Sequence, residues 1–288
     1  MLEDSGKVII VYRDETRYLL VTDKSPFHPL DYFWKDQPGD RGLIKTEDVT
    51  LKISDTVTWP IQKQSQTLSY SPNLNIKRSD PNYILLTAHV IETITKGGDI
   101  FPLEEIFSLG LIGKNVRMEV DKEYRDSLSR PHSASHLMSL ALNKVLDPLW
   151  RKDYSRDSLG NRNFDSAAIS RSTISPNVST DTYRLGDSLR KKGFSSDVLL
   201  ANIEEYSKKI EETIAEWCKL KDVEVIMNGK GDFLGSYWTW NTIVDGKNVS
   251  IPCGGTHVGR IGEIVPISIE MKYNAETKEM TIVTSIKH

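Results

Sequence analysis

Two short clusters of histidine and cysteine, far apart in the chain, constrain its fold more than any other feature. His132 and His136 are four positions apart, and so are Cys253 and His257. Residues at i and i+4 lie on one face of a helix, so both imidazoles of the first pair can point at one atom. Two glycines between Cys253 and His257 permit a sharp turn that brings the thiolate and imidazole together. If the clusters meet, three nitrogens and one sulfur surround one point.

This donor set is typical of zinc, which takes His nitrogen and Cys sulfur in tetrahedral geometry. We therefore predict a zinc site built from His132, His136, Cys253 and His257. If all four side chains bind at once, no position is left for water. If one is loose, water enters and its pKa falls toward neutrality, so the zinc is either structural or catalytic. A metalloprotease helix needs a Glu directly after the first His as general base, and Ser133 holds that position here.

Length and composition indicate a soluble globular protein of two domains. The chain has 288 residues, of which 38% are hydrophobic and 27% charged. No apolar run approaches the roughly 18 residues of a spanning helix, and the N-terminus lacks the pattern of a signal peptide. We therefore expect a cytoplasmic protein with no membrane partner. Two cysteines are too few for a disulfide framework, and Cys218, beside Trp217 on a predicted amphipathic helix, is expected to be a core thiol.

Strand and helix signals predict an α+β fold that changes character near residue 121. Before that point, short runs rich in β-branched and aromatic residues alternate with Pro and Gly. The clearest runs are 7–12, 18–22 and 83–90. Many short strands with turn signals predict a small N-terminal β-barrel over residues 1–120.

Residues 121–288 are predicted to form an α+β domain with a largely antiparallel sheet packed on helices. The periodicity predicts helices over 133–146 and 200–217, strands over 223–227 and 237–244, and a terminal hairpin of 271–273 and 281–286. The stretch 151–192, rich in Ser, Asp, Arg and Asn, is expected to be a long irregular loop with short elements, and such loops are often functional.

Charge is unevenly distributed along the chain. The net charge is −3, so no global basic field indicates nucleic acid. Between Lys144 and Lys192, however, ten Lys or Arg accompany six Asp. Such a local patch either meets phosphate or forms a solvated surface of mixed charge.

The two metal motifs resemble those of a known family. Residues 130–137, Arg-Pro-His-Ser-Ala-Ser-His-Leu, and 252–258, Pro-Cys-Gly-Gly-Thr-His-Val, are similar to the metal motifs of the alanyl-tRNA synthetase editing domain and of its freestanding relatives, the AlaX trans-editing proteins. Residues 23–27 and 37–42 resemble the entrance of the family's barrel, and 262–266 resembles its continuation after the second motif. The resemblance thus spans most of the chain. It departs from the family at 31–36, where many members have a run of glycines.

The resemblance implies a metal-dependent aminoacyl-tRNA hydrolase, a carboxylic ester hydrolase with Zn²⁺ as its cofactor. It would deacylate mischarged tRNA in trans, removing Ser or Gly from tRNA for alanine. Nothing in the sequence indicates an oligomer. The candidates for contact with the amino acid are Thr256, Gln37 and the hydroxyls that follow the metal helix, Ser172, Thr173 and Ser175. Thr256 either orients the substrate or stabilises the turn, and the three hydroxyls remain alternatives.

If segment 144–192 lines the groove that holds tRNA, its basic residues are the candidates for phosphate contact. These candidates are Arg151, Lys152, Arg190, Lys191 and Lys192. One alternative function is an inactive tRNA-binding module with a structural zinc. A third is editing of Ser-tRNA for threonine, because the threonyl-tRNA synthetase editing domain shares the spacing of both metal motifs. The Gly-Gly-Thr turn and the barrel domain argue against that third function.

Overall fold

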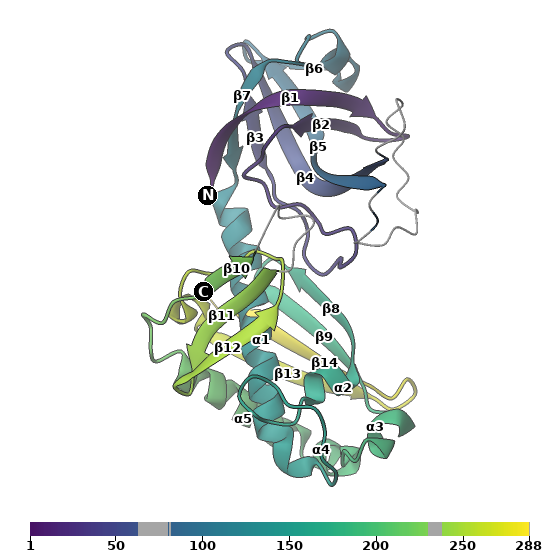
Figure 1. Ribbon diagram of the computed structural model, residues 1–288, viewed down its shortest axis with the longest axis vertical. Helices are drawn as coiled ribbons and strands as arrows, with labels where there is room; N and C mark the ends of the chain where they lie inside the picture. The colour runs from purple at the N-terminus through teal and green to yellow at the C-terminus, as the bar shows by residue number, and fades with distance from the viewer. Residues whose placement is uncertain (63–79, 81, 230–237, 288) are drawn as a thin grey trace. The chain divides into compact units, whose positions relative to one another are not determined.

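The computed structural model describes residues 1–62, 80, 82–229 and 238–287, which fall into two compact units (Figure 1). The described residues of one unit are Met1–Arg125, and the other unit begins at Asp126. None of the helices in these residues combines the length and the apolar character needed to cross a bilayer. The fold is mixed α+β, as predicted.

The first unit is an antiparallel β-barrel. Its ring is formed by β1 (Glu3–Arg13), β7 (Asn115–Val120), β3 (Gly42–Lys45), β4 (Val49–Gln62), β5 (Tyr83–Lys96) and β2 (Tyr18–Thr22), in that order. Pairing of β2 with both β5 and β1 closes the ring. The short strand β6 (Asp99–Phe101) pairs with β5 outside the ring and leads into the 3-10 helix η1 (Leu103–Phe107). The strands predicted over 7–12, 18–22 and 83–90 are β1, β2 and the first part of β5.

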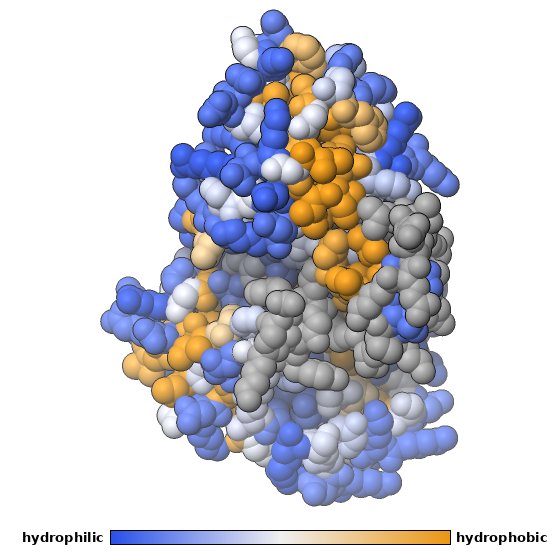
Figure 2. All heavy atoms as spheres, turned by 45° about the horizontal axis from the view of Figure 1, so that its top comes forward, coloured by the Kyte–Doolittle hydropathy of each residue, from blue (hydrophilic) through white to orange (hydrophobic). Residues whose placement is uncertain are grey.

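Strand β2 is buried along its whole length because both of its faces meet apolar side chains. Tyr18 and Leu20 contribute to one hydrophobic cluster, and Leu19 and Val21 contribute to a second one that includes Trp59. This explains why β2 is a continuous apolar run without polar alternation. The barrel surface also carries exposed apolar side chains, and Figure 2 shows a band of them on the face in view. The large exposed apolar residues of this unit include Ile9, Ile84, Ile100, Phe107 and Ile112.

A buried ion pair anchors the barrel segment 37–42. The Asp40 side chain is fully buried, and the guanidinium of Arg125 donates from Nε to both of its carboxylate oxygens at 3.1 Å. Gly39 packs so closely on β4 that an added Cβ would lie 1.8 Å from the Thr56 carbonyl oxygen. The family-like Pro-Gly-Asp-Arg sequence therefore has a structural role at Gly39 and Asp40.

The second unit contains two antiparallel sheets and most of the helices. One sheet has the order β10 (Ile226–Gly229), β11 (Trp238–Val244), β12 (Lys247–Pro252), and the other has the order β13 (Ile267–Asn274), β14 (Glu279–Ile286), β9 (Val178–Arg184), β8 (Ile169–Ser175). The helices are α1 (Lys122–Leu146), α2 (Phe164–Ala168), α3 (Asp187–Lys191), α4 (Ser196–Ala201) and α5 (Ile203–Trp217), with 3-10 helices η2 (Asp147–Leu149) and η3 (Ile261–Ile264).

Helix α1 runs alongside the strands of both sheets (Figure 1), and its side chains share one hydrophobic core with them. Leu137 and Met138 of α1 lie in the same cluster as Trp240 of β11 and Ile282 of β14, and all four are fully buried. This packing explains why the helix is apolar around most of its circumference. Its C-terminal half is therefore held from two sides, which gives the residues on it a fixed position.

Helix α5 covers the edge of the four-stranded sheet. Ser207 donates its hydroxyl to the carbonyl of Ile269 at 2.9 Å, and Glu211 accepts the Ile269 N–H at 2.9 Å. Both backbone groups of this β13 residue are thus satisfied by the helix. The contact protects the sheet from pairing with another chain.

The helix predicted over 133–146 is confirmed, but it begins at Lys122 and contains Pro131. A proline has no N–H to donate to the carbonyl four residues earlier, which here belongs to Ser127. That carbonyl instead accepts the N–H of Asn177 at 2.7 Å. Asn177 occupies the turn between β8 and β9 with a φ of 62°. The proline therefore frees a backbone group that ties the four-stranded sheet to the helix.

The stretch 151–192 contains the short helices α2 and α3, but the prediction of an irregular loop is wrong where β8 and β9 form paired strands of a sheet. On β9, the buried face carries Ser179, Asp181 and Tyr183. Polar residues at two of these buried positions interrupt the alternation of apolar residues by which a strand is predicted.

The strand predicted over 223–227 lies at Ile226–Gly229, and Tyr237 of the next strand lies outside the described residues. The terminal hairpin is confirmed as β13 and β14.

Candidate metal centre

The structure brings the four predicted metal ligands together. The donor atoms of His132, His136, Cys253 and His257 all lie within 4.8 Å of one another. Cys253 Sγ lies 3.3 Å from His132 Nε2 and 3.2 Å from His257 Nε2. Tetrahedral zinc with bonds of about 2.0–2.3 Å separates its ligand atoms by about 3.3–3.8 Å, and the two Cys253 distances lie at the lower end of this range. The cluster could therefore bind a metal.

Helix α1 and the loop after β12 supply the two halves of the cluster. The i, i+4 spacing on α1 places the His132 and His136 ring centroids 5.2 Å apart. Cys253 follows the end of β12 directly, and its N–H donates to the Trp238 carbonyl at 2.9 Å. The Gly255 N–H points back to Cys253 Sγ at 3.4 Å, a contact that favours the thiolate. The predicted sharp turn therefore aims the sulfur at the helix.

The surroundings of His136 suit a side chain that binds a metal better than one that forms a hydrogen bond. Its Nε2 atom is buried and has no hydrogen-bond partner. Burial lowers the pKa of His136 to about 4, so the ring is neutral at pH 7, as a metal ligand must be. The ring of Trp240, which is fully buried, lies 5.1 Å from the His136 ring and forms an apolar wall. A bound ion would satisfy this unpaired ring nitrogen.

Two serines of α1 join the cluster, and the spacing of the histidines alone did not predict them. Ser129 donates its hydroxyl to Thr256 Oγ1 at 2.9 Å, and Ser133 Oγ lies 3.1 Å from His257 Nδ1. Ser129, His132, Ser133 and His136 occupy positions i, i+3, i+4 and i+7, which form one face of a helix. This polar stripe within an otherwise buried helix is the signal in the sequence that could have identified both serines.

The structure separates the three hydroxyl candidates of β8. Ser172 is the cross-strand partner of Asp181, and cross-strand partners point to the same face of a sheet. Asp181 is buried and accepts a hydrogen bond from Ser135 of α1 at 3.2 Å, so this is the face that meets the helix. Thr173 points to the opposite face, and Ser175 is exposed at the β8–β9 turn. Of the three, Ser172 is the hydroxyl on the side of α1.

Gln37 and the remaining histidines and cysteine of the described residues lie outside the cluster. Gln37 belongs to the barrel unit, where its side chain is buried. His28 and His89 are buried in that unit too, and burial lowers their pKa values to about 4 and about 3, so both rings are neutral. Cys218 is buried at the end of α5, and burial raises the pKa of its thiol to about 11. A thiol with such a pKa stays protonated and unreactive.

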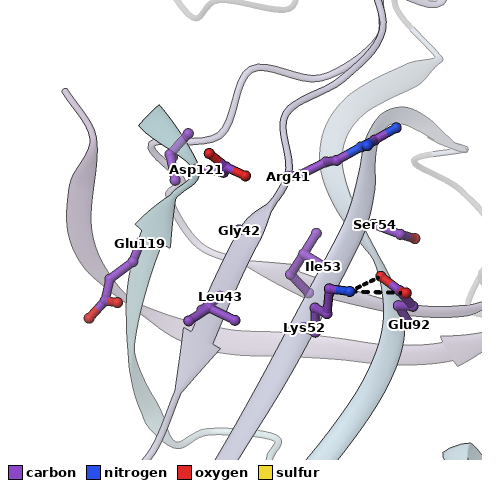
Figure 3. A pocket seen from close by; sticks show the side chains of 10 residues that line it. Arg41, Gly42, Leu43, Lys52, Ile53, Ser54, Glu92, Glu119 and Asp121 are labelled. Atoms are coloured by element: carbon purple, nitrogen blue, oxygen red, sulfur yellow. Dashed lines mark hydrogen bonds and ion pairs between the residues drawn. The ribbon is translucent and has the colours of Figure 1, made fainter. Parts of the chain in front are cut away.

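The barrel carries a surface cavity of about 720 Å³ that contains none of the predicted site residues (Figure 3). Its lining includes the cations Arg41 and Lys52 and the carboxylates Glu92, Glu119 and Asp121. Lys52 pairs with Glu92 at 3.1 Å across its edge. This mixed charge does not favour a phosphate ligand.

The five basic candidates lie together where the chain leaves η2 and meets the end of α3. The Arg151 N–H donates to the Gly193 carbonyl at 2.8 Å, and Lys152 Nζ donates to the Lys191 carbonyl at 3.2 Å. Lys192 is partly buried and donates to a backbone carbonyl of α2 at 2.9 Å. Within the described part of the chain, none of the five makes an ion pair with a carboxylate. The group lies beyond the C-terminal end of α1, and the part of the helix between His136 and that end is about 15 Å long.

The chain resembles known proteins only at low identity, but the resemblance extends over most of its length. No protein-family model matches the chain. The chain is 25% identical over 265 residues to the alanine–tRNA ligase of Chlorobium phaeobacteroides, which covers 91% of this chain and 25% of the ligase. It is 23% identical over 285 residues to the alanyl-tRNA editing protein AlaX-L of Pyrococcus horikoshii, which covers 96% of this chain and 53% of that protein.

A further relative is the alanine–tRNA ligase of Opitutus terrae, 25% identical over 286 residues that cover 98% of this chain and 25% of the ligase. The chain thus spans between a quarter and about half of the length of these curated relatives. The similarities have low identity but extend over most of the chain. They support an AlaX-like editing domain and confirm the resemblance predicted from the motifs.

Proposed function

We propose that this chain is a trans-editing hydrolase that deacylates mischarged tRNA, Ser- or Gly-tRNA for alanine, with a zinc ion held by His132, His136, Cys253 and His257. The observation that carries the proposal is the convergence of these four donors from two distant segments. The names of the relatives, alanine–tRNA ligase and alanyl-tRNA editing protein, support the reaction class. The proposal includes a barrel domain over residues 1–120 and an editing domain over 121–288.

The side chains around the cluster have distinct roles in this proposal. A bound ion would polarise the ester carbonyl, and it would lower the pKa of a water where one of the four ligands gives up its position. Three of the four ligands are only half-buried, which leaves the cluster accessible to an ester. Thr256, oriented by Ser129, and Ser172, on the helix side of its sheet, are the hydroxyls we assign to the amino acid. A hydroxyl that hydrogen-bonds a serine side chain discriminates better than an apolar pocket does.

A tRNA-binding module with a structural zinc is the second candidate, because four protein ligands can complete a tetrahedron and leave no open position. In that case chelation would unfold the editing unit, and the metal-loaded protein would bind tRNA without hydrolysing it. Thermal unfolding with and without a chelator, measured beside deacylation, separates the two functions.

The direct test is deacylation of a panel of Ser-tRNA and Gly-tRNA for alanine, correctly charged Ala-tRNA, and Ser-tRNA for threonine. We expect zinc-dependent release of serine or glycine from tRNA for alanine at least about tenfold faster than release of alanine. Faster hydrolysis of Ser-tRNA for threonine would reassign the substrate. Hydrolysis of none of the four by zinc-loaded protein would refute the proposal.

Neutralising the exposed basic group should weaken tRNA binding in a salt-dependent way. We expect Arg151→Gln, Arg190→Gln and Lys191→Gln together to reduce the slope of log K against log salt by about 2 to 3, because each phosphate contact contributes about 0.7–0.9. The measurement is a binding titration at several salt concentrations.

The matched control removes the same charge from exposed lysines elsewhere in the unit, by Lys208→Gln, Lys219→Gln and Lys272→Gln. Each of these lysines forms only a surface ion pair. An equal change of slope in both triple variants would remove the basic group from the tRNA footprint.

A further inference from the structure

Ser133 of α1 lies between this helix and the loop that carries two of the proposed ligands, Cys253 and His257. Its side chain is fully buried. Its Oγ lies 3.1 Å from His257 Nδ1 and accepts the N–H of Val258 at 3.1 Å. A single hydroxyl therefore contacts one ring nitrogen of a proposed ligand and the backbone directly after it.

The other ring nitrogen of His257 faces the cluster. His257 Nε2 lies 3.2 Å from Cys253 Sγ, on the side where the ligand atoms converge. A neutral imidazole has one protonated nitrogen and one free lone pair. If Nε2 binds the ion, Nδ1 carries the proton and needs an acceptor, and Ser133 Oγ is at hydrogen-bonding distance. The hydroxyl oxygen has two lone pairs, so it can accept from Nδ1–H and from the Val258 N–H at the same time.

We propose that Ser133 is the positioning residue that selects the metal-binding tautomer of His257 and holds its ring toward the ion. The inference rests on the metal centre of the proposed function. Partners that accept the second N–H of a ligating histidine fix its tautomer and orientation, and their loss usually lowers metal affinity 10- to 100-fold. Ser133 directly follows the first histidine, the position at which a metalloprotease has its general base. In this proposal its role is to orient His257.

The neighbouring serine provides a matched control for this role. Ser129 lies one turn earlier on the same helix face and also contacts the loop, but its partner is the Thr256 hydroxyl and not a histidine. Removal of the Ser129 hydroxyl takes away one helix-to-loop contact, and removal of the Ser133 hydroxyl takes away two, those with Val258 and His257. Only removal of the Ser133 hydroxyl takes away the acceptor for His257 Nδ1–H.

The test measures zinc affinity by competition with a chromophoric chelator. We expect Ser133→Ala to weaken affinity by about 10- to 100-fold, Ser129→Ala by less than about threefold, and Ser133→Thr to restore most of the loss, because threonine retains the hydroxyl. Circular dichroism of the metal-free variants reports whether each one folds. Equal losses in the two alanine variants, or unchanged affinity in Ser133→Ala, would overturn the inference.

A second measurement uses the unaltered protein, so it decides the matter even if Ser133→Ala does not fold. Long-range ¹H–¹⁵N correlation spectra of the zinc-loaded chain should show His257 protonated at Nδ1 and bound through Nε2. Binding through Nδ1 would overturn the inference and leave the proposed hydrolase intact. A wild-type chain that binds no zinc would refute the metal centre itself, and with it the role of Ser133.

Discussion

Replacement of Cys253 by alanine is expected to abolish stoichiometric zinc binding and to lower the deacylation rate by about a thousandfold or more. The substitution removes the one sulfur of the cluster, whose Sγ lies within 3.3 Å of two of the three histidines. The several kcal/mol that a bound ion contributes to an ester-hydrolysis transition state correspond to a change of this size. Metal analysis and single-turnover deacylation of the same preparation measure both effects.

Cys218 provides the control, because it is the chain's other cysteine and lies in the core at the end of α5. Cys218→Ala should retain full zinc content and deacylation, at a cost of about 1–2 kcal/mol in the free energy of unfolding. A Cys253→Ala protein that lacks zinc and still deacylates at the wild-type rate would show that hydrolysis does not depend on this cluster.

The second large effect is expected in the barrel, where Asp40→Asn should lower the free energy of unfolding by roughly 3–5 kcal/mol. The carboxylate is fully buried and pairs with Arg125, which is itself mostly buried. Arg125 also donates to the carbonyls of Met1 and Pro26, so it cannot turn to water without breaking further bonds. Loss of the carboxylate leaves a buried guanidinium without its counter-charge. Urea unfolding followed by circular dichroism measures the loss.

Lys52→Ala is the comparison, because it breaks the ion pair with Glu92, in which both side chains are about half exposed. An exposed pair contributes about 0–1 kcal/mol, so this variant should unfold close to the wild-type midpoint. Similar midpoints for Asp40→Asn and Lys52→Ala would mean that the buried pair does not hold the barrel segment 37–42 in place.

The parts of the fold and of the site that could be predicted from the sequence depend on residues that are only a few positions apart. His132 and His136 lie on one helix face because i and i+4 coincide there, and the Gly-Gly turn brings Cys253 and His257 together. The barrel strands were predictable because β-branched runs and turn residues alternate along residues 1–120. Each of these features depends on neighbours within a few positions of the chain.

The features that escaped prediction depend on contacts between distant segments. Strand β9 carries the buried Asp181, and its partner Ser135 lies on a helix far back in the sequence. Helix α1 continues through Pro131 because Asn177, in a later turn, uses the carbonyl that the proline leaves free. In both cases a tertiary hydrogen bond compensates for a residue that local propensity disfavours at its position.

X-ray absorption at the zinc K-edge tests most directly whether one ion joins the helix and the loop. We expect one zinc per chain, with one sulfur at about 2.3 Å and three imidazole nitrogens at about 2.0–2.1 Å. The sulfur contribution should disappear in Cys253→Ala and persist in Cys218→Ala. A zinc site without a sulfur neighbour, or a fully active chain without zinc, would contradict the metal centre proposed for this protein.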